Sequence, residues 1–145
     1  MRLSARVEYA AIAAVELARR GAAGGPVGMK EICEAHGVPA KFLVHILLEL
    51  KRAGLVRSVR GVGGGYLLAR PADEITLRDI EAALAGEPES AAPVTAGLAG
   101  SSRVAASLKA AWEAAAEARA AALEGVTLAD LVARSRGVGE PMYYI

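Results

Sequence analysis

The glycine-rich segment Arg60-Gly-Val-Gly-Gly-Gly-Tyr66 constrains the fold of this chain more than any other feature. Leu55–Val59 before it alternates apolar and polar residues, and Tyr66–Ala69 after it is a short apolar run. Two short strand patterns around a glycine loop predict a β-hairpin. Because glycines tolerate positive φ and carry no side chain, the tip of this hairpin can lie close against another backbone.

A phosphate-binding loop is one alternative for these glycines, and a plain hairpin turn that contacts nothing is another. A P-loop requires Gly-Lys-Ser/Thr at the start of a helix. In this chain the glycines lead into Tyr66 and a strand, and no lysine follows them. The nucleotide-binding alternative therefore receives little support. The two helices predicted directly before the hairpin favour a functional loop over a plain turn.

Two helices are predicted before the hairpin. A short helix covers Met29–Ala35 and is closed by Gly37, and a longer helix covers Pro39–Ala53 with Gly54 as its left-handed C-terminal cap. A helix, a tight turn and a longer helix form the helix-turn-helix plan. The hairpin that follows directly is then a wing, and the sequence predicts a winged helix-turn-helix.

The rest of the chain is predicted to be helical. Apolar spacing and capping residues indicate helices over Ser4–Arg20, Leu77–Leu84 and Ser102–Leu123, and a last short helix after Thr127. The expected fold class is mainly α with a small β-hairpin wing, plus a long dimerisation helix. We divide the chain into a winged helix-turn-helix DNA-binding domain (1–84), a loop (85–101), a dimerisation helix with a short C-terminal helix (102–136) and a tail (137–145).

The formal net charge of +1 hides an asymmetry between the two halves of the chain. Residues 1–70 contain eleven Lys/Arg and five Asp/Glu, whereas residues 71–145 contain six and eleven. A basic half indicates a polyanion partner such as double-stranded DNA, although an ordinary solvated face is the alternative. In the longer predicted helix, Lys41 and His45 lie away from the apolar stripe, where a helix-turn-helix meets the major groove. Arg57 and Arg60 lie on the N-terminal side of the glycine loop, and Arg60, at the edge of the tip, is placed for the minor groove.

Enzyme chemistry receives no support from the residue types present. His36, His45 and the single cysteine, Cys33, form no set with zinc-ligand spacing. Cys33 lies on the apolar side of its helix, which favours an inert thiol over a redox switch. A single cysteine and the lack of about eighteen consecutive apolar residues predict a cytoplasmic protein without a membrane segment.

The long alanine-rich helix carries a wide apolar face, made by Val104, Leu108, Ala111, Trp112 and Ala115. Such a face packs either on its own domain or on a second copy of the chain. Because helix-turn-helix proteins usually bind two-fold half-sites as dimers, we expect this face to form a homodimer interface.

Three stretches resemble the Rrf2 family of bacterial regulators, which includes IscR, NsrR and CymR: residues 1–10, 55–68 and 126–131. The resemblance covers 1–84 well and 102–134 in outline. It implies a winged helix-turn-helix with a long helix that crosses to a partner subunit, and operator binding as a homodimer. It matches Lys41, Phe42 and His45 to DNA-facing positions and Arg60 to the wing arginine. The residues expected to contact DNA are Lys41, Phe42, His45, Arg57, Ser58, Arg60, Gly61, Gly63, Gly64, Gly65 and Tyr66.

The chain departs from the cluster-binding members of this family. Those members carry three cysteines in the region that matches 86–106, and this chain has neither cysteine nor histidine there. Lys109 replaces a histidine ligand of some members, and Val44 replaces a base-discriminating glutamate. Because iron–sulphur clusters need thiolate or imidazole ligands, we expect no cofactor and a different operator.

The sequence therefore predicts a sequence-specific DNA-binding transcriptional regulator, more a repressor than an activator, that acts as a homodimer without an iron–sulphur cluster. The alternative is a winged-helix protein-interaction module that no longer binds DNA. Its signal stays open among a small-molecule effector, a protein partner and thiol oxidation at Cys33.

Overall fold

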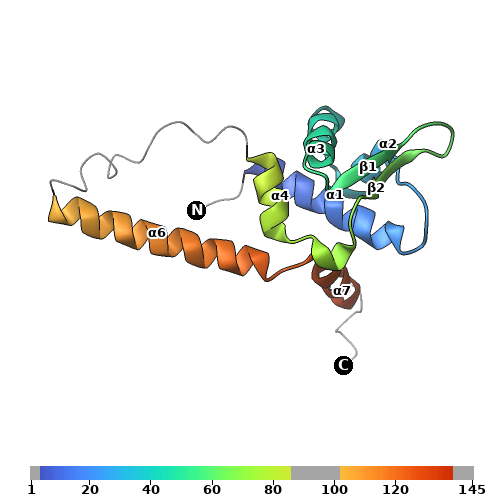
Figure 1. The fold of residues 1–145 in the computed structure, drawn as a ribbon. Coiled ribbons are helices and arrows are strands. Elements are labelled where there is room, and N and C mark those ends of the chain that lie inside the picture. Colours follow the sequence, from blue (N-terminus) through green and yellow to red (C-terminus); the bar gives the residue numbers. More distant parts are fainter. Residues whose placement is uncertain (1–3, 86–101, 139–145) are drawn as a thin grey trace, which may run out of the picture.

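The computed structural model describes residues 4–85 and 102–138 and confirms the expected fold class, mainly helical with a two-stranded hairpin (Figure 1). The 3₁₀ helix η1 lies between the hairpin and α4. The elements are α1 (Ala5–Gly21), α2 (Met29–His36), α3 (Ala40–Arg52), β1 (Val56–Val59), β2 (Gly65–Leu68), η1 (Ala72–Glu74), α4 (Leu77–Leu84), α6 (Arg103–Glu124) and α7 (Leu128–Val138).

Helices α2 and α3 form the helix-turn-helix. Gly37 closes α2 with a left-handed φ of 67°, and its N–H donates to the carbonyl of Cys33. Pro39 precedes the first residue of α3 with φ −63°, the value that its ring imposes. The inner side of α3 is fully buried and consists of Leu43, Ile46, Leu47 and Leu50. Helix α3 is thereby fixed in the core by one apolar stripe, and the face opposite this stripe is exposed.

The wing is a hairpin with a third, single-residue partner. Strands β1 and β2 are antiparallel, with Val56 opposite Leu68 and Val59 opposite Gly65. On the other edge of β2, Val27 pairs with Tyr66 through backbone hydrogen bonds of 2.9 and 2.8 Å. Local patterns did not predict this bridge, because the residue Val27 comes before both helices of the helix-turn-helix.

Helix α7 packs on the N-terminal core. It contacts α1 and η1, and Leu128 is fully buried in the core shared with α1 and α3. A short bridge between Thr76 and Thr127 anchors its start, and Leu128 N–H donates to Ile75 at 2.9 Å. The helix also runs to Val138, two residues into the expected tail.

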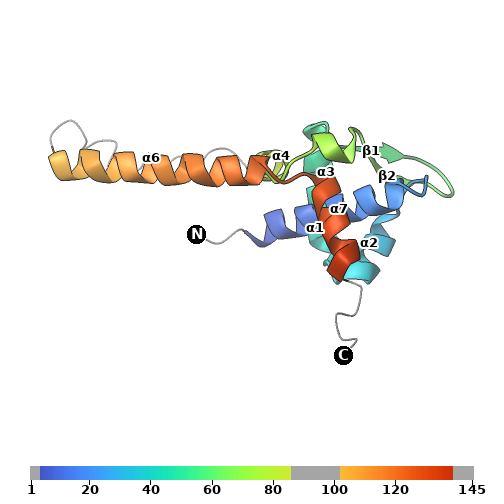
Figure 2. The ribbon, with the colours of Figure 1, turned by 90° about the horizontal axis from the view of Figure 1, so that it is seen from below.

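Helix α6 extends away from this core, and its ion pairs with α4, within the described residues, lie near its C-terminal end (Figures 1 and 2). Arg119 pairs there with Glu81 of α4, and Arg78 of α4 donates to Glu124 at 2.8 Å. Along the projecting part, Val104, Leu108 and Trp112 are 79%, 44% and 62% exposed. In a single subunit this apolar face is uncovered. Within the ranges that the structure describes, no helix is long and apolar enough to cross a membrane.

Candidate nucleic-acid interface

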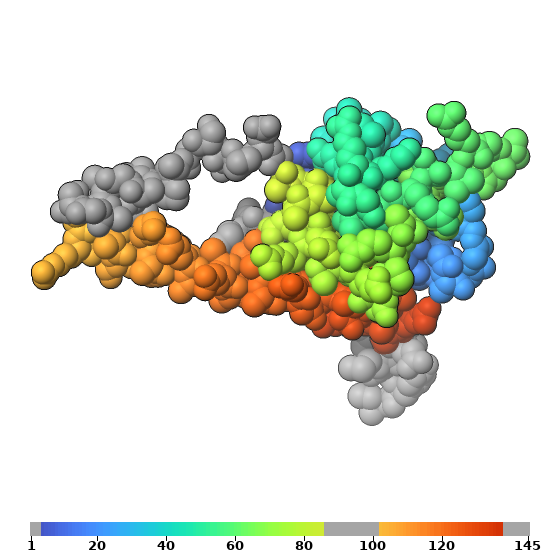
Figure 3. Space-filling view, viewed as in Figure 1, coloured from blue at the N-terminus to red at the C-terminus, as the bar shows by residue number. Residues whose placement is uncertain are grey.

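The outer face of α3 lies opposite its buried stripe. Because side chains three and four residues apart share a helix face, the exposed residues form one continuous strip. The strip consists of Lys41, Val44, His45, Leu48 and Arg52. Figure 3 shows α3 and the hairpin on the same side of the molecule.

An aromatic pair borders this strip toward α1. The ring of Phe42 stacks on Tyr9 with 6.1 Å between centroids, and the ammonium of Lys41 lies 5.0 Å from the Phe42 centroid. Arg6 of α1 also pairs with Glu49 of α3. The first two turns of α1 therefore border the strip. No local pattern predicted a role for Arg6 or Tyr9, because both contacts are long-range.

The wing is tied to the last turn of α3. The Lys51 ammonium donates to the hydroxyl of Ser58 on β1 at 2.8 Å. Since alternate strand residues face opposite sides, Arg57 leaves the hairpin on the face opposite Ser58. It lines a shallow hollow with Arg70 beside the end of α1. The structure therefore brings Ser58 to α3 and does not bring Arg57 there.

The tip of the wing is open to solvent. Arg60, Gly61 and Gly63 are exposed, and Val62, which sequence reasoning left out, is fully exposed between them. Gly61 and Gly63 have φ of 99° and 76°, a conformation that favours glycine. An arginine and an apolar side chain thus stand at the exposed end of the hairpin.

The base of the wing is a scaffold. Gly64, Gly65 and Tyr66 are half-buried, and Tyr66 packs against the hydrophobic core. A Cβ at Gly64 would lie 2.2 Å from the carbonyl oxygen of Val59, and one at Gly65 would lie 2.4 Å from that of Val27. These three residues fix the shape of the hairpin, and their contact with DNA stays a prediction.

Three cations of the α3 strip and the wing tip are not neutralised by acidic neighbours. Across residues 4–85 and 102–138, no salt bridge involves Lys41, Arg52 or Arg60. By contrast, Arg119 on α6 is paired with a glutamate. Unpaired cations on one face favour a polyanion partner, which releases counterions when it binds.

A buried carboxylate lies behind the helix-turn-helix. Glu16 of α1 is 2% exposed, and it accepts hydrogen bonds from Arg19 and Arg20 at 2.6 Å and contacts Nε2 of His36 at 2.8 Å. Burial by itself raises the pKa of Glu16, but the hydrogen bonds from Arg19, His36 and Arg20 outweigh it and hold the pKa at about 2. This cluster joins α1 to the end of α2.

The residues present do not fit an iron–sulphur cluster. The chain has one cysteine, Cys33, which is half-buried, and two histidines, whereas clusters are held by several thiolates or imidazoles. Lys109, at the place of a histidine in some relatives, pairs with Glu113 at 2.9 Å. The described part of the chain also contains no group of three or more His, Cys, Asp or Glu suited to a metal ion. Most of the expected loop, 86–101, lies outside the described residues.

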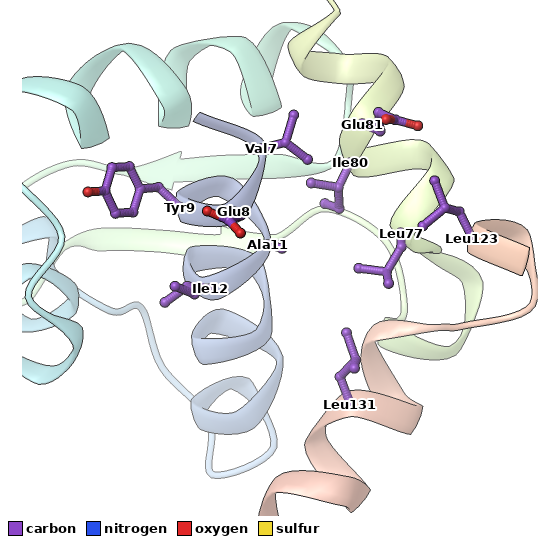
Figure 4. A pocket seen from close by; sticks show the side chains of 10 residues that line it. All are labelled: Val7, Glu8, Tyr9, Ala11, Ile12, Leu77, Ile80, Glu81, Leu123 and Leu131. Carbon is purple, nitrogen blue, oxygen red and sulfur yellow. The ribbon is translucent and has the colours of Figure 1, made fainter. Parts of the chain in front are cut away.

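A groove of about 550 Å³ lies where α1, α4, α6 and α7 meet (Figure 4). Its walls are mainly apolar and include Ile12, Leu77, Leu123 and Leu131, with Glu8 and Glu81 as charged residues. Such a lining suits a small apolar effector or an apolar side chain of a second subunit. Both occupants stay predictions.

A helix-turn-helix with an exposed outer strip and a glycine-tipped hairpin on the same side defines a winged helix-turn-helix of the transcription-regulator type. The profile of the Rrf2 family, described as iron-dependent transcriptional regulators, matches residues 3–134. The chain belongs to the Rrf2 family, and it is a transcriptional regulator rather than an enzyme.

Relatives and solved structures agree with this assignment. A helix-turn-helix-type transcriptional regulator of Mycobacterium tuberculosis is 40% identical over 131 residues, which cover 90% of this chain and 81% of the relative. The structure of IscR from T. potens has a TM-score of 0.79 at 30% identity, covering 99% of this chain and 95% of that one. CymR, the global cysteine regulator of B. subtilis, has a TM-score of 0.67 at 27% identity, covering 92% and 98%.

Proposed function

We propose that this regulator binds a specific duplex operator as a homodimer and represses nearby genes without an iron–sulphur cluster. The observation that carries the proposal is the unneutralised basic face that α3 and the wing share. A dimer seated on promoter DNA would repress by occupying the site that polymerase needs. A cytoplasmic location, where the chromosome lies, goes with this proposal.

In the proposed complex, α3 enters the major groove and the wing tip meets the minor groove. Lys41 and His45 are exposed in the first half of α3, where base edges and phosphates come within reach. Arg60 stands at the exposed tip, and the bare backbone at Gly61 and Gly63 lets the tip approach a sugar-phosphate strand. Phe42 supports Lys41 through the contact between ammonium and ring.

The exposed face of α6 supports the homodimer. A helix that leaves Val104, Leu108 and Trp112 open to water gains free energy when a second apolar surface covers it. Ala111 and Ala115 are exposed on the same face, and their small side chains permit a close approach. A second copy of α6 offers a matching surface, since a two-fold interface is formed by the same residues from both subunits.

The experiment that tests this function is selection of duplexes from a random library, followed by a salt titration of the best one. We expect log Kd to rise linearly with log salt, because bound phosphates release counterions. Arg60→Ala should weaken binding by about 1–3 kcal/mol, whereas the exposed Arg136→Ala on α7 should leave it unchanged. Failure to enrich any duplex at low salt would overturn the proposal and favour the protein-interaction module.

A further inference from the structure

Two apolar side chains stand in the middle of the basic strip on α3. Val44 is 48% exposed and Leu48 is 42% exposed. They are one helical turn apart and share a face with Lys41, His45 and Arg52, all of which are exposed. Neither is needed for the core of α3, whose buried stripe lies on the other side.

The cations around this pair indicate its occupant. An apolar protein partner would have to cover Lys41 and Arg52, which have no acidic partner among the residues that the structure describes. Burying unpaired cations against an apolar surface is unfavourable, whereas the phosphates that line a DNA groove neutralise them.

The major groove offers apolar side chains one matching group. Each base pair presents hydrogen-bond donors and acceptors there, and only thymine adds an apolar group, its C5-methyl. Val44 and Leu48 have no polar side-chain atoms, so they leave an opposed cytosine amino group without a partner, which is unfavourable. Contact with a thymine methyl instead buries apolar surface on both sides.

Building on the proposed DNA binding, we propose that Val44 and Leu48 are specificity-determining residues that recognise thymine C5-methyl groups in each operator half-site. The strip then combines two functions. The cations hold the phosphates and hydrogen-bonding base edges, and the apolar pair selects T·A pairs at the positions that it covers. Operators of this protein should therefore contain fixed thymines where α3 crosses the major groove.

The test replaces thymine by deoxyuridine, which removes the methyl group and keeps every hydrogen-bonding atom. Each thymine in one half-site of the library-selected duplex is replaced in turn, and Kd is measured for the full chain. We expect about a fourfold loss of affinity at one or two positions, the effect of one buried methyl-sized group. Thymines elsewhere in the half-site serve as the internal control, with unchanged Kd.

Val44→Ala and Leu48→Ala then assign the contacts. Each variant should abolish the deoxyuridine effect at its own thymine and leave the other effect in place. The salt slope of binding should stay as in the parent chain, since no phosphate contact is lost. Both positions are exposed and alanine favours helices, so thermal unfolding should change little and confirm that the variants are folded.

The outcomes separate this proposal from the proposed function. If no duplex is selected, DNA binding itself fails and the apolar pair loses its proposed ligand. If a duplex is bound with the expected salt dependence but full replacement of thymine by deoxyuridine leaves Kd unchanged, methyl recognition is wrong and DNA binding stands. A deoxyuridine effect that both alanine variants retain also overturns the assignment to Val44 and Leu48.

Discussion

At the scale of single residues, the most consequential contacts lie behind the helix-turn-helix, away from the face proposed for DNA. Glu16 is buried in α1, and its carboxylate collects Arg19, Arg20 and His36 around it. Because His36 is the last residue of α2, this carboxylate fixes the end of the first helix of the helix-turn-helix. The position of α3 depends in turn on where α2 ends.

Replacement of Glu16 by glutamine should destabilise the protein at neutral pH. We expect a loss of about 1–3 kcal/mol in the free energy of unfolding, since the variant takes away the charged partner of Arg19 and leaves Arg20 with Glu31 alone. Chemical denaturation measures this loss. Glu34→Gln is the control, because Glu34 is exposed and its pair with Lys30 spans 3.8 Å. Equal effects of the two substitutions would contradict a structural role for the buried carboxylate.

The same residue predicts how stability depends on pH. The pKa of Glu16 is about 2 in the folded protein, against an ordinary value of 4.5. A lowered pKa in the folded state means that ionised Glu16 stabilises the fold fully above about pH 4.5, and that this stabilisation is lost as pH falls toward 2. The difference in unfolding free energy between the parent chain and Glu16→Gln should therefore shrink over that range. A constant difference would contradict the assignment.

At the scale of elements, the wing shows why its glycines are not equivalent. Gly61 and Gly63 serve the turn through positive φ, whereas Gly64 and Gly65 are in close contact with backbone carbonyls. The residue pattern around these glycines predicted the hairpin. It did not predict the pairing of Val27 with Tyr66, which supplies one of those carbonyls.

Gly65→Ala should damage the wing more than Gly63→Asn. An added Cβ at Gly65 would lie 2.4 Å from the Val27 carbonyl oxygen, whereas nothing lies within 4 Å at Gly63, where asparagine tolerates positive φ. We expect Gly65→Ala to lower the free energy of unfolding by about 2 kcal/mol or more and to weaken DNA binding. Thermal unfolding and Kd for the selected duplex measure both effects. A Gly65→Ala chain as stable as Gly63→Asn would contradict the close approach.

Helix boundaries were predictable where a capping residue marks them. Thr76 and Asp79 form a capping box in which each side chain binds the other's backbone N–H, and α4 begins at Leu77 as expected. The packing partner of α7 was not predictable in this way. Its apolar residues fit any apolar surface, and long-range backbone contacts, the Thr76–Thr127 bridge and the Leu128–Ile75 hydrogen bond, direct it onto the N-terminal core.

At the scale of the whole molecule, the two proposed interfaces lie on different elements. The apolar face proposed for dimerisation is on α6, and the basic face proposed for DNA is on α3 and the wing. Helix α6 is joined to α4 by pairs near its end, and its start lies far from the core (Figures 1 and 2). A projecting helix of this kind can reach a second subunit without covering α3 or the wing. The groove beside the end of α6 is lined by Leu123 of α6 and by residues of α1, α4 and α7. An effector bound there would therefore contact both α6 and the N-terminal core (Figure 4).

A charge placed on the apolar face of α6 should prevent dimerisation. We expect Leu108→Glu to shift the protein to monomers, because burying an unpaired carboxylate in an apolar interface is strongly unfavourable. Ala106→Glu is the matched control, since Ala106 lies two residues before Leu108 and its side chain therefore points to roughly the opposite side of the helix. Analytical ultracentrifugation measures the oligomeric state. A Leu108→Glu chain that sediments as a dimer would exclude this face as the interface.

The sequence by itself determined the local elements of this protein: the helix-turn-helix, the glycine hairpin and the apolar stripe of α3. These follow from periodicity, capping and turn chemistry, which act over a few residues. The tertiary structure alone decided that Val27 joins the hairpin, that α7 packs on the N-terminal core, and that Glu16 reaches His36. Such contacts join residues far apart in the chain. They form only when the elements pack into one core and bury their apolar surfaces away from water.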